Sequence, residues 1–171
     1  MKIVLLGYMG SGKTTVARLL AEQLQLRLMD LDTLIETYAN QRIPEIFQEK
    51  GEIFFRKLEH QVLEKTLETP ESFILALGGG TPCYGRNMDI ILQATQRVFY
   101  LKMGIPQLTK RLINEKQDRP LISHIADEEL PEFIGKHLFE RQPFYMKAPY
   151  IVKSDNKSAR EIAEEISKEL V

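Results

Sequence analysis

Residues 7–15 read Gly-Tyr-Met-Gly-Ser-Gly-Lys-Thr-Thr and match the pattern G-x-x-x-x-G-K-[ST]. They follow an apolar run at 3–6 and precede apolar residues at helical spacing. In such a loop the backbone N–H groups surround phosphate oxygens, and the helix N-terminus adds positive potential. Lys13 is expected to reach the β- and γ-phosphates and the Thr14 hydroxyl to coordinate Mg²⁺. The stretch predicts a nucleoside triphosphate site, and the alternative is a glycine-rich turn that fits the pattern by chance.

The bulk properties are those of an ordinary globular chain. Its 171 residues suit one domain, with 43% hydrophobic and 27% charged residues. The net charge of -1 gives no overall field for nucleic acid or an anionic membrane. The single cysteine, Cys83, excludes an internal disulfide and fits a reducing compartment. With no signal peptide and no membrane-length apolar stretch, we expect a cytoplasmic protein, and we expect a monomer.

Short apolar segments alternate with helical patterns along the whole chain. This order is typical of a three-layer α/β fold, with a parallel sheet between helices. The apolar segments, read as five strands, are 2–6, 26–29, 73–77, 97–101 and 150–153. Ligands of such sheets bind at the carboxyl ends of the strands. Residues 7–15, 30–32 and 78–80 should therefore meet in one cleft.

Asp30 and Asp32 lie two residues apart where the second predicted strand ends. Alternate residues share a face, so both carboxylates can point into the cleft. One could assist Mg²⁺ through water, and the other could accept or orient the proton of a hydroxyl acceptor. The alternative is that Asp32 only caps the helix that begins at Thr33.

Three arginines are candidates for binding anions. Arg56 has Glu52 at i−4 and Glu59 at i+3, which could hold its guanidinium in place or form an ordinary surface ion pair. Arg141 continues the apolar stripe of its helix, so it either has a buried carboxylate partner or faces the cleft. Arg119 is held extended by Pro120 and could close over a triphosphate, or remain a solvated charge.

Gly78, Gly79 and Gly80 follow the third predicted strand. Three successive glycines are costly in backbone entropy. They would let a substrate lie against bare backbone, whereas a tight turn is the alternative. This strand has no terminal aspartate of the kind that binds metal in many phosphate-loop proteins, which leaves Asp30 as the substitute.

Taken together, these motifs resemble the shikimate kinase family, nearly from end to end. The resemblance lies in five spaced motifs: Gly7-x-Met9-Gly10-x-Gly12-Lys13-Thr14-Thr15, Asp30-x-Asp32, Phe55-Arg56-x-x-Glu59, Gly78-Gly79-Gly80, and Arg119-Pro120-Leu121 with Arg141-x-x-x-Tyr145. It implies a five-stranded parallel sheet of the nucleoside monophosphate kinase type. It also implies ATP-dependent phosphorylation of shikimate to shikimate 3-phosphate.

The resemblance also implies a role for each matching residue. Asp32 would bind the ring hydroxyls as the candidate base, Arg56 and Arg141 would grip the carboxylate, and Gly78–Gly80 would line the ring. The lid at 112–126 would carry Arg119, and the substrate-binding helices would span 33–64. Arg111 and the 154–158 loop would lie on the adenine side. The phosphates would be held by Gly10, Ser11, Gly12, Lys13, Thr14 and Thr15, with Mg²⁺ on Thr14 and near Asp30.

Two alternatives stay open on the sequence. Another small-molecule kinase, acting on gluconate or a nucleoside monophosphate, would share the phosphate loop, but the later motifs are not expected there together. A nucleotide-dependent switch would need sensing motifs, and the chain has no D-x-x-G.

Overall fold

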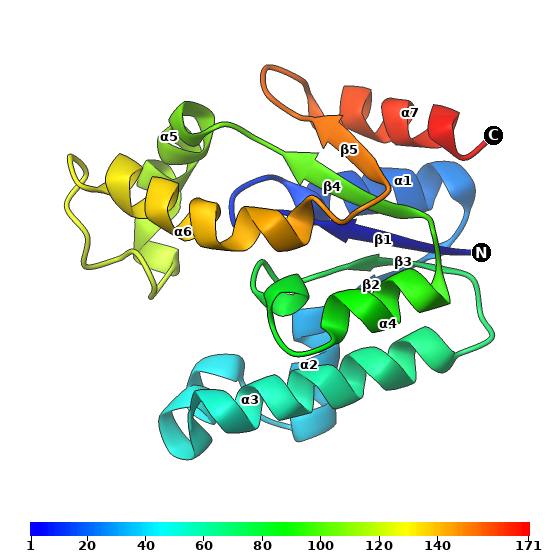
Figure 1. The fold of residues 1–171 in the computed structure, drawn as a ribbon, viewed down its shortest axis with the longest axis horizontal. Helices are drawn as coiled ribbons and strands as arrows, with labels where there is room; N and C mark the ends of the chain where they lie inside the picture. Colours follow the sequence, from blue (N-terminus) through cyan, green and yellow to red (C-terminus); the bar gives the residue numbers. More distant parts are fainter.

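The computed structural model describes residues 1–171. Its centre is a five-stranded, fully parallel sheet in the order β2-β3-β1-β4-β5 (Figure 1). The strands are β1 (Lys2–Leu6), β2 (Arg27–Asp30), β3 (Phe73–Ala76), β4 (Val98–Lys102) and β5 (Tyr150–Lys153). The predicted parallel sheet is confirmed, and no strand end differs from its predicted position by more than one residue.

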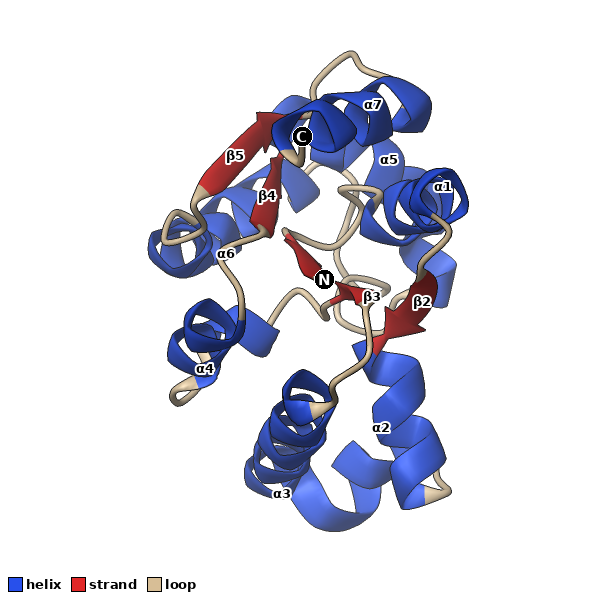
Figure 2. Ribbon diagram, turned by 90° about the vertical axis from the view of Figure 1, so that its right-hand side faces the viewer, coloured by secondary structure: helices blue, strands red, loops and turns tan.

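Helices cover both faces of this sheet (Figure 2). The α-helices are α1 (Lys13–Leu24), α2 (Leu31–Ala39), α3 (Ile43–Glu68), α4 (Asn87–Ala94), α5 (Ile105–Glu115), α6 (Leu130–Tyr145) and α7 (Ala159–Glu169). Two short 3₁₀ turns, η1 (Thr81–Cys83) and η2 (Lys116–Asp118), complete the chain. None of the helices is long and apolar enough to cross a membrane.

The strand residues are divided between two cores, one on each face. Ile3 and Leu5 of β1 pack with α1 and α7, whereas Val4 and Leu6 pack with α3, α4 and α6. A strand that is buried on both faces needs apolar residues at every position rather than at alternate ones. This is why the central strands β1, β3 and β4 could be recognised as apolar runs, whereas the edge strands β2 and β5 are largely unburied and less apolar.

Glycine conformation shapes two places in the chain. In the loop after β1, Gly10 and Gly12 have φ of 79° and 87°, a region that L side chains rarely adopt. Gly51 has φ 83° and ψ 173°, so the helical conformation of α3 is interrupted there. The N-terminal part of α3 thus forms a separate arm that packs against α2 at one end of the molecule (Figure 1).

The segment predicted as a lid is not a simple loop. Its first residues, 112–115, complete α5, and η2 follows at once. Turns then run to the start of α6, and Lys116 Nζ donates to Asp127 Oδ1 at 2.8 Å across the base of the segment. The lid is therefore closed at its base by an ion pair.

Candidate active site

The carboxyl ends of β1, β2 and β3 meet around one polar cleft, as the sequence predicts. Its volume is 340 Å³. Fourteen residues line it: Met9, Gly10, Gly12, Lys13, Thr14, Thr15, Asp30, Asp32, Leu77, Gly78, Gly79, Arg111, Glu115 and Arg119. The cleft thus contains the phosphate loop, both aspartates and two arginines of α5 and the lid.

The phosphate loop has its lysine directed back over its own backbone. Lys13 Nζ donates to the carbonyl oxygens of Gly7 at 2.7 Å and Tyr8 at 3.0 Å. Burial, helped by the charge of Arg119, lowers the pKa of Lys13 to about 8. The ammonium is nevertheless mainly protonated at neutral pH. Thr14 and Thr15 are exposed at the start of α1, whereas the Ser11 hydroxyl is buried without a hydrogen-bond partner.

The two aspartates have different local roles. Asp30, not Asp32, caps α2: its Oδ1 accepts from the Thr33 amide at 3.1 Å. The alternative that Asp32 only caps a helix beginning at Thr33 is wrong. Helix α2 begins two residues earlier, at Leu31, whose side chain is fully buried. Asp32 lies in that turn with an accessible carboxylate, free to meet a ligand.

The environment of Asp32 favours its protonated form. Desolvation by the surrounding protein, and then the negative charges of Asp30 and Glu59, raise the pKa of Asp32 to about 6, opposed by Lys13. A carboxylate with such a pKa is a better proton acceptor at neutral pH than an ordinary one.

Arg56 is held in place on α3. Its Nη1 donates to Glu59 Oε1 at 2.9 Å, and Glu59, which is almost fully buried, also accepts from Thr81 at 2.8 Å. The other predicted partner, Glu52, does not pair with Arg56. The Tyr84 ring lies 3.8 Å from the Arg56 guanidinium carbon, and its hydroxyl donates to Glu52 instead.

Arg141 faces the glycines after β3, as predicted for a residue without a carboxylate partner. It forms no ion pair within 4.0 Å. A Cβ on Gly79 would lie 3.1 Å from Arg141 Nη1, and one on Gly80 would lie 2.9 Å from Arg56 Nη2 and 3.3 Å from Arg141 Nη2. Gly80 has φ −84°, so close approach, not backbone strain, explains this glycine.

The lack of a side chain at Gly78 likewise allows Asp32 to approach the backbone closely. A Cβ there would lie 3.0 Å from Asp32 Oδ1. The triple glycine therefore brings Asp32, Arg141 and Arg56 against bare backbone in succession. Tyr145 supports this arrangement by donating to the Gly79 carbonyl at 2.5 Å.

Arg119 and Arg111 lie on the phosphate side of the cleft. Arg119 has extended backbone, φ −124° and ψ 96°, and its Nε and Nη2 both donate to Glu115 Oε2, at 2.9 and 2.8 Å. Arg111 Nη1 donates to the Gly10 carbonyl at 3.3 Å. Arg111 also borders a neighbouring hollow with Gln107 and Asn156, on the predicted adenine side.

The donors near the phosphate loop fit Mg²⁺. Thr14 and Asp30 offer hard oxygen ligands, and only Oδ1 of Asp30 takes part in the helix cap. No group of three or more histidine, cysteine or carboxylate side chains could hold a metal by itself. A magnesium ion that is bound mainly by phosphates and water needs no more protein ligands than these.

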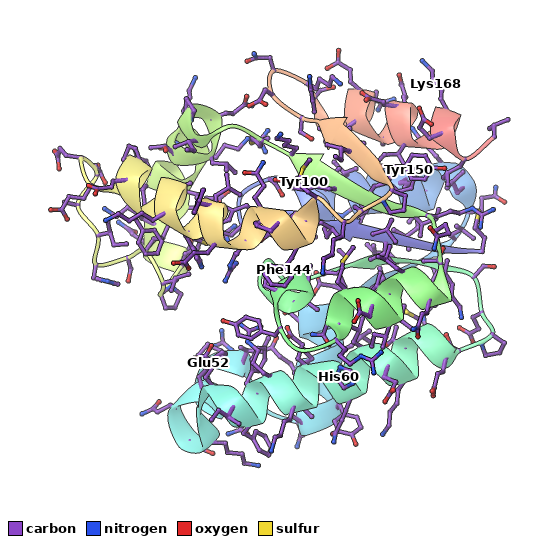
Figure 3. The ribbon with its side chains drawn as sticks, viewed as in Figure 1. Glu52, His60, Tyr100, Phe144, Tyr150 and Lys168 are labelled. Atoms are coloured by element: carbon purple, nitrogen blue, oxygen red, sulfur yellow. The ribbon has the colours of Figure 1, made fainter.

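A larger cavity lies on the other side of Arg56. Its volume is 680 Å³, and it lies between α3 and the η1–α4 segment. Figure 3 shows Glu52 and His60 on the side of α3 that faces this segment. His60 contacts Asn87 Oδ1 at 2.7 Å there. The cavity contains no residue of the phosphate loop, so it is not where phosphoryl transfer could occur.

Two site residues, Tyr84 and Glu115, were not predicted, and neither was the burial of a third, Glu59. Tyr84 is far from Arg56 in the sequence, so no spacing rule could connect them. Glu115 stands four residues before Arg119, a spacing that could have suggested the pair. Glu59 appears in the sequence motifs, but its burial beneath Arg56 is visible only in the fold.

Comparisons with known proteins agree with this arrangement. A family model described as shikimate kinase matches residues 9–171. Shikimate kinases of Flavobacterium psychrophilum and Flavobacterium johnsoniae are 46% and 48% identical to the chain. The first alignment covers 98% of this chain and 97% of the relative, and the second covers 96% of each.

Two solved structures have the same fold, each with a TM-score of 0.88. The shikimate kinase of Bacteroides thetaiotaomicron is 35% identical, with 99% of this chain and 96% of that chain covered. The shikimate kinase of Acinetobacter baumannii, solved in complex with shikimate, is 32% identical, with 99% and 92% covered. The chain belongs to the shikimate kinase family.

Proposed function

We propose that this protein transfers the γ-phosphoryl group of MgATP to the 3-hydroxyl of shikimate, giving shikimate 3-phosphate and ADP. The observation that carries the proposal is the meeting of Arg56 and Arg141 at Gly80, next to the two glycines that line the phosphate cleft, Gly78 and Gly79. Two guanidinium groups beside bare backbone suit the carboxylate of a flat, hydroxylated ring.

The acceptor binds between these arginines and Asp32. Glu59 and Tyr84 fix the guanidinium of Arg56, so little conformational entropy is lost when it binds a carboxylate. Gly78–Gly80 leave room for the ring, and Asp32 accepts a hydrogen bond from the ring hydroxyls. As the 3-hydroxyl oxygen bonds to phosphorus, its proton passes to Asp32, and the bond from phosphorus to the ADP oxygen breaks.

The donor binds on the other side of Asp32. Backbone and side chains of Gly10–Thr15 hold the phosphates, Lys13 pairs with the β- and γ-phosphates, and Arg111 lies beside the adenosine. Arg119 releases Glu115 and pairs with the transferred group, where charge neutralisation contributes strongly to catalysis. Thr14 and Asp30 would hold Mg²⁺, which would neutralise more of the phosphate charge.

Two segments are proposed to move around this site. The helices at 33–64 carry Asp32's neighbours and Arg56, and the segment at 112–126 carries Arg119. Their closure would exclude water from the reacting phosphate.

The site uses residues of one chain only, in keeping with a monomer. Burial raises the pKa of Cys83 to about 11, so its thiol is mainly protonated at neutral pH.

The experiment that tests the proposal is a coupled assay of ADP release. Shikimate, gluconate and nucleoside monophosphates are each supplied with MgATP. We expect turnover with shikimate alone. Turnover with gluconate or a nucleotide, and none with shikimate, would reject the proposed acceptor while leaving phosphoryl transfer intact.

A further inference from the structure

One part-buried contact of the phosphate loop has no role in the site described above. The hydroxyl of Tyr8, the second residue of the loop, is hydrogen bonded to Nδ1 of His137 on α6 at 2.9 Å. The rings also meet edge to face, with centroids 5.4 Å apart. Tyr8 is 1% exposed, and its partner is 129 residues further along the chain. This is a direct side-chain link between the phosphate loop and α6.

The Tyr8 end of this link belongs to the nucleotide half of the site. The Tyr8 carbonyl accepts from Lys13 Nζ at 3.0 Å and from the Ser11 amide at 3.2 Å. The backbone of Tyr8 is therefore fixed by the loop, while its side chain is fixed by α6. A displacement of either element would have to be accommodated by the other.

The His137 end belongs to the acceptor half. Arg141 follows His137 by one helical turn, so the two side chains lie on the same face of α6. The Arg141 guanidinium carbon lies 6.0 Å from the centre of the Tyr8 ring, and Arg141 Nη1 faces Gly79. The position of a Cβ on Gly79 is also only 3.4 Å from the Met9 amide nitrogen, so the phosphate loop, the triple glycine and Arg141 meet here.

The protonation of the pair suits a permanent contact. Burial raises the pKa of Tyr8 to about 12. Burial and then the charge of Arg141 lower the pKa of His137 to about 4. Both side chains are thus neutral over the range in which the enzyme would work, and the link does not titrate away.

We propose that the Tyr8–His137 pair is a positioning contact that sets Arg141 against the phosphate loop for binding the shikimate carboxylate. The inference rests on the proposed function. Neither Tyr8 nor His137 touches the substrate in this account. Their effect passes through Arg141, which predicts a specific pattern in the kinetics of variants.

Tyr8→Phe removes the hydroxyl and keeps the ring that packs near Arg141. It should raise KM for shikimate by about 3- to 10-fold, the usual range for a lost hydrogen bond, and change KM for ATP less than about 2-fold. His137→Phe should do the same, and the double variant should be no worse than either single one. Tyr38→Phe is the matched control, because it removes an exposed hydroxyl that accepts from Lys65, away from the cleft.

The decisive comparison is made in the background of Arg141→Ala. If the pair acts through Arg141, Tyr8→Phe adds no further loss of shikimate affinity there. An additional loss of the same size in that background, or a Tyr8→Phe enzyme with unchanged KM for shikimate, would overturn the inference. Urea unfolding of each variant separates this effect from a loss of stability, which would not depend on Arg141.

The wild-type control separates the two proposals. If the wild-type protein binds shikimate without phosphorylating it, only the proposed function fails. The dissociation constant of shikimate then replaces KM in the same comparison. If it does not bind shikimate, both proposals fall.

Discussion

At the scale of single residues, Asp32 and Lys13 face each other across the cleft with pKa values displaced toward neutrality. The pKa of Asp32 is raised to about 6 and that of Lys13 is lowered to about 8. Phosphoryl transfer as proposed requires Asp32 ionised and Lys13 protonated. These forms coexist mainly between the two values.

The first prediction is therefore a bell-shaped pH profile of kcat/KM for shikimate. Activity should fall below about pH 6 as Asp32 becomes protonated, and above about pH 8 as Lys13 loses its proton. In saturating MgATP the alkaline limb should move upward, because bound phosphate favours the ammonium form. Initial rates from pH 5 to 9.5 measure both limbs.

Asp32→Asn is the control for the acidic limb. It should lower kcat by about 100-fold or more and leave ATP affinity nearly unchanged.

The same variant also predicts a change in stability. Because the pKa of Asp32 is higher in the folded protein than its ordinary 3.8, ionisation of the Asp32 carboxyl group opposes folding above about pH 6. The variant should thus be more stable than wild type at pH 8 and no more stable below pH 4. A variant with near-normal kcat would exclude Asp32 as the base.

A second residue-scale prediction concerns Gly80→Ala. The new Cβ would lie 2.9 Å from Arg56 Nη2 and 3.1 Å from its Nη1. The ends of long side chains can move, so the fold should survive, but both guanidinium groups would leave their positions. We expect KM for shikimate to rise at least about 10-fold, with little change in the free energy of unfolding.

Gly135→Ala on α6 provides the matched control, because a Cβ there makes an ordinary 3.4 Å contact with Ile105 Cδ1 of α5. It should leave KM unchanged and stabilise the helix by up to about 1 kcal/mol. Equal effects of the two substitutions on KM would contradict the account of Gly80.

At the scale of elements, the end of α5 keeps a carboxylate inside the phosphate cleft. Glu115 pairs with Arg119 through two hydrogen bonds, at 2.9 and 2.8 Å, and both side chains line the cleft. A triphosphate must compete with Glu115 for this arginine and also meets a negative charge. The pair therefore opposes nucleotide binding.

Glu115→Gln should remove this opposition. We expect KM for ATP to fall by about 2- to 5-fold, the range that corresponds to a partly exposed ion pair, with KM for shikimate unchanged. Glu132→Gln breaks an equivalent i,i+4 pair, with Lys136 at 3.1 Å, on the exposed face of α6, and should change neither constant. A rise in KM for ATP would instead show that Glu115 holds Arg119 where the phosphates need it.

At the scale of the whole molecule, much of the architecture could be predicted because both faces of the sheet are covered. Burial on both faces requires apolar runs in the central strands β1, β3 and β4, and such runs are easy to recognise in a sequence. The glycine at 51 and the capping box of Ser158 and Glu161 also identify helix ends correctly, because each satisfies a local backbone requirement.

The parts that could not be predicted depend on contacts between distant segments. Helix α2 begins at Leu31 and not at Thr33, because burial of the Leu31 side chain outweighs the local capping preference of Asp32. Glu52 accepts a hydrogen bond from Tyr84 and does not pair with Arg56, because the Tyr84 ring, from the segment between η1 and α4, lies against the Arg56 guanidinium. Spacing rules describe neighbours on one helix and carry no information on contacts with side chains from distant segments.

The central claim is tested most directly by the position of the phosphate in the product. Shikimate and MgATP are incubated with the protein, and the product is examined by phosphorus and proton NMR. We predict one new phosphate ester, whose phosphorus couples to the proton on ring carbon 3, formed in equal amount to ADP. Release of ADP with free phosphate, or a phosphate on another hydroxyl, would contradict the account.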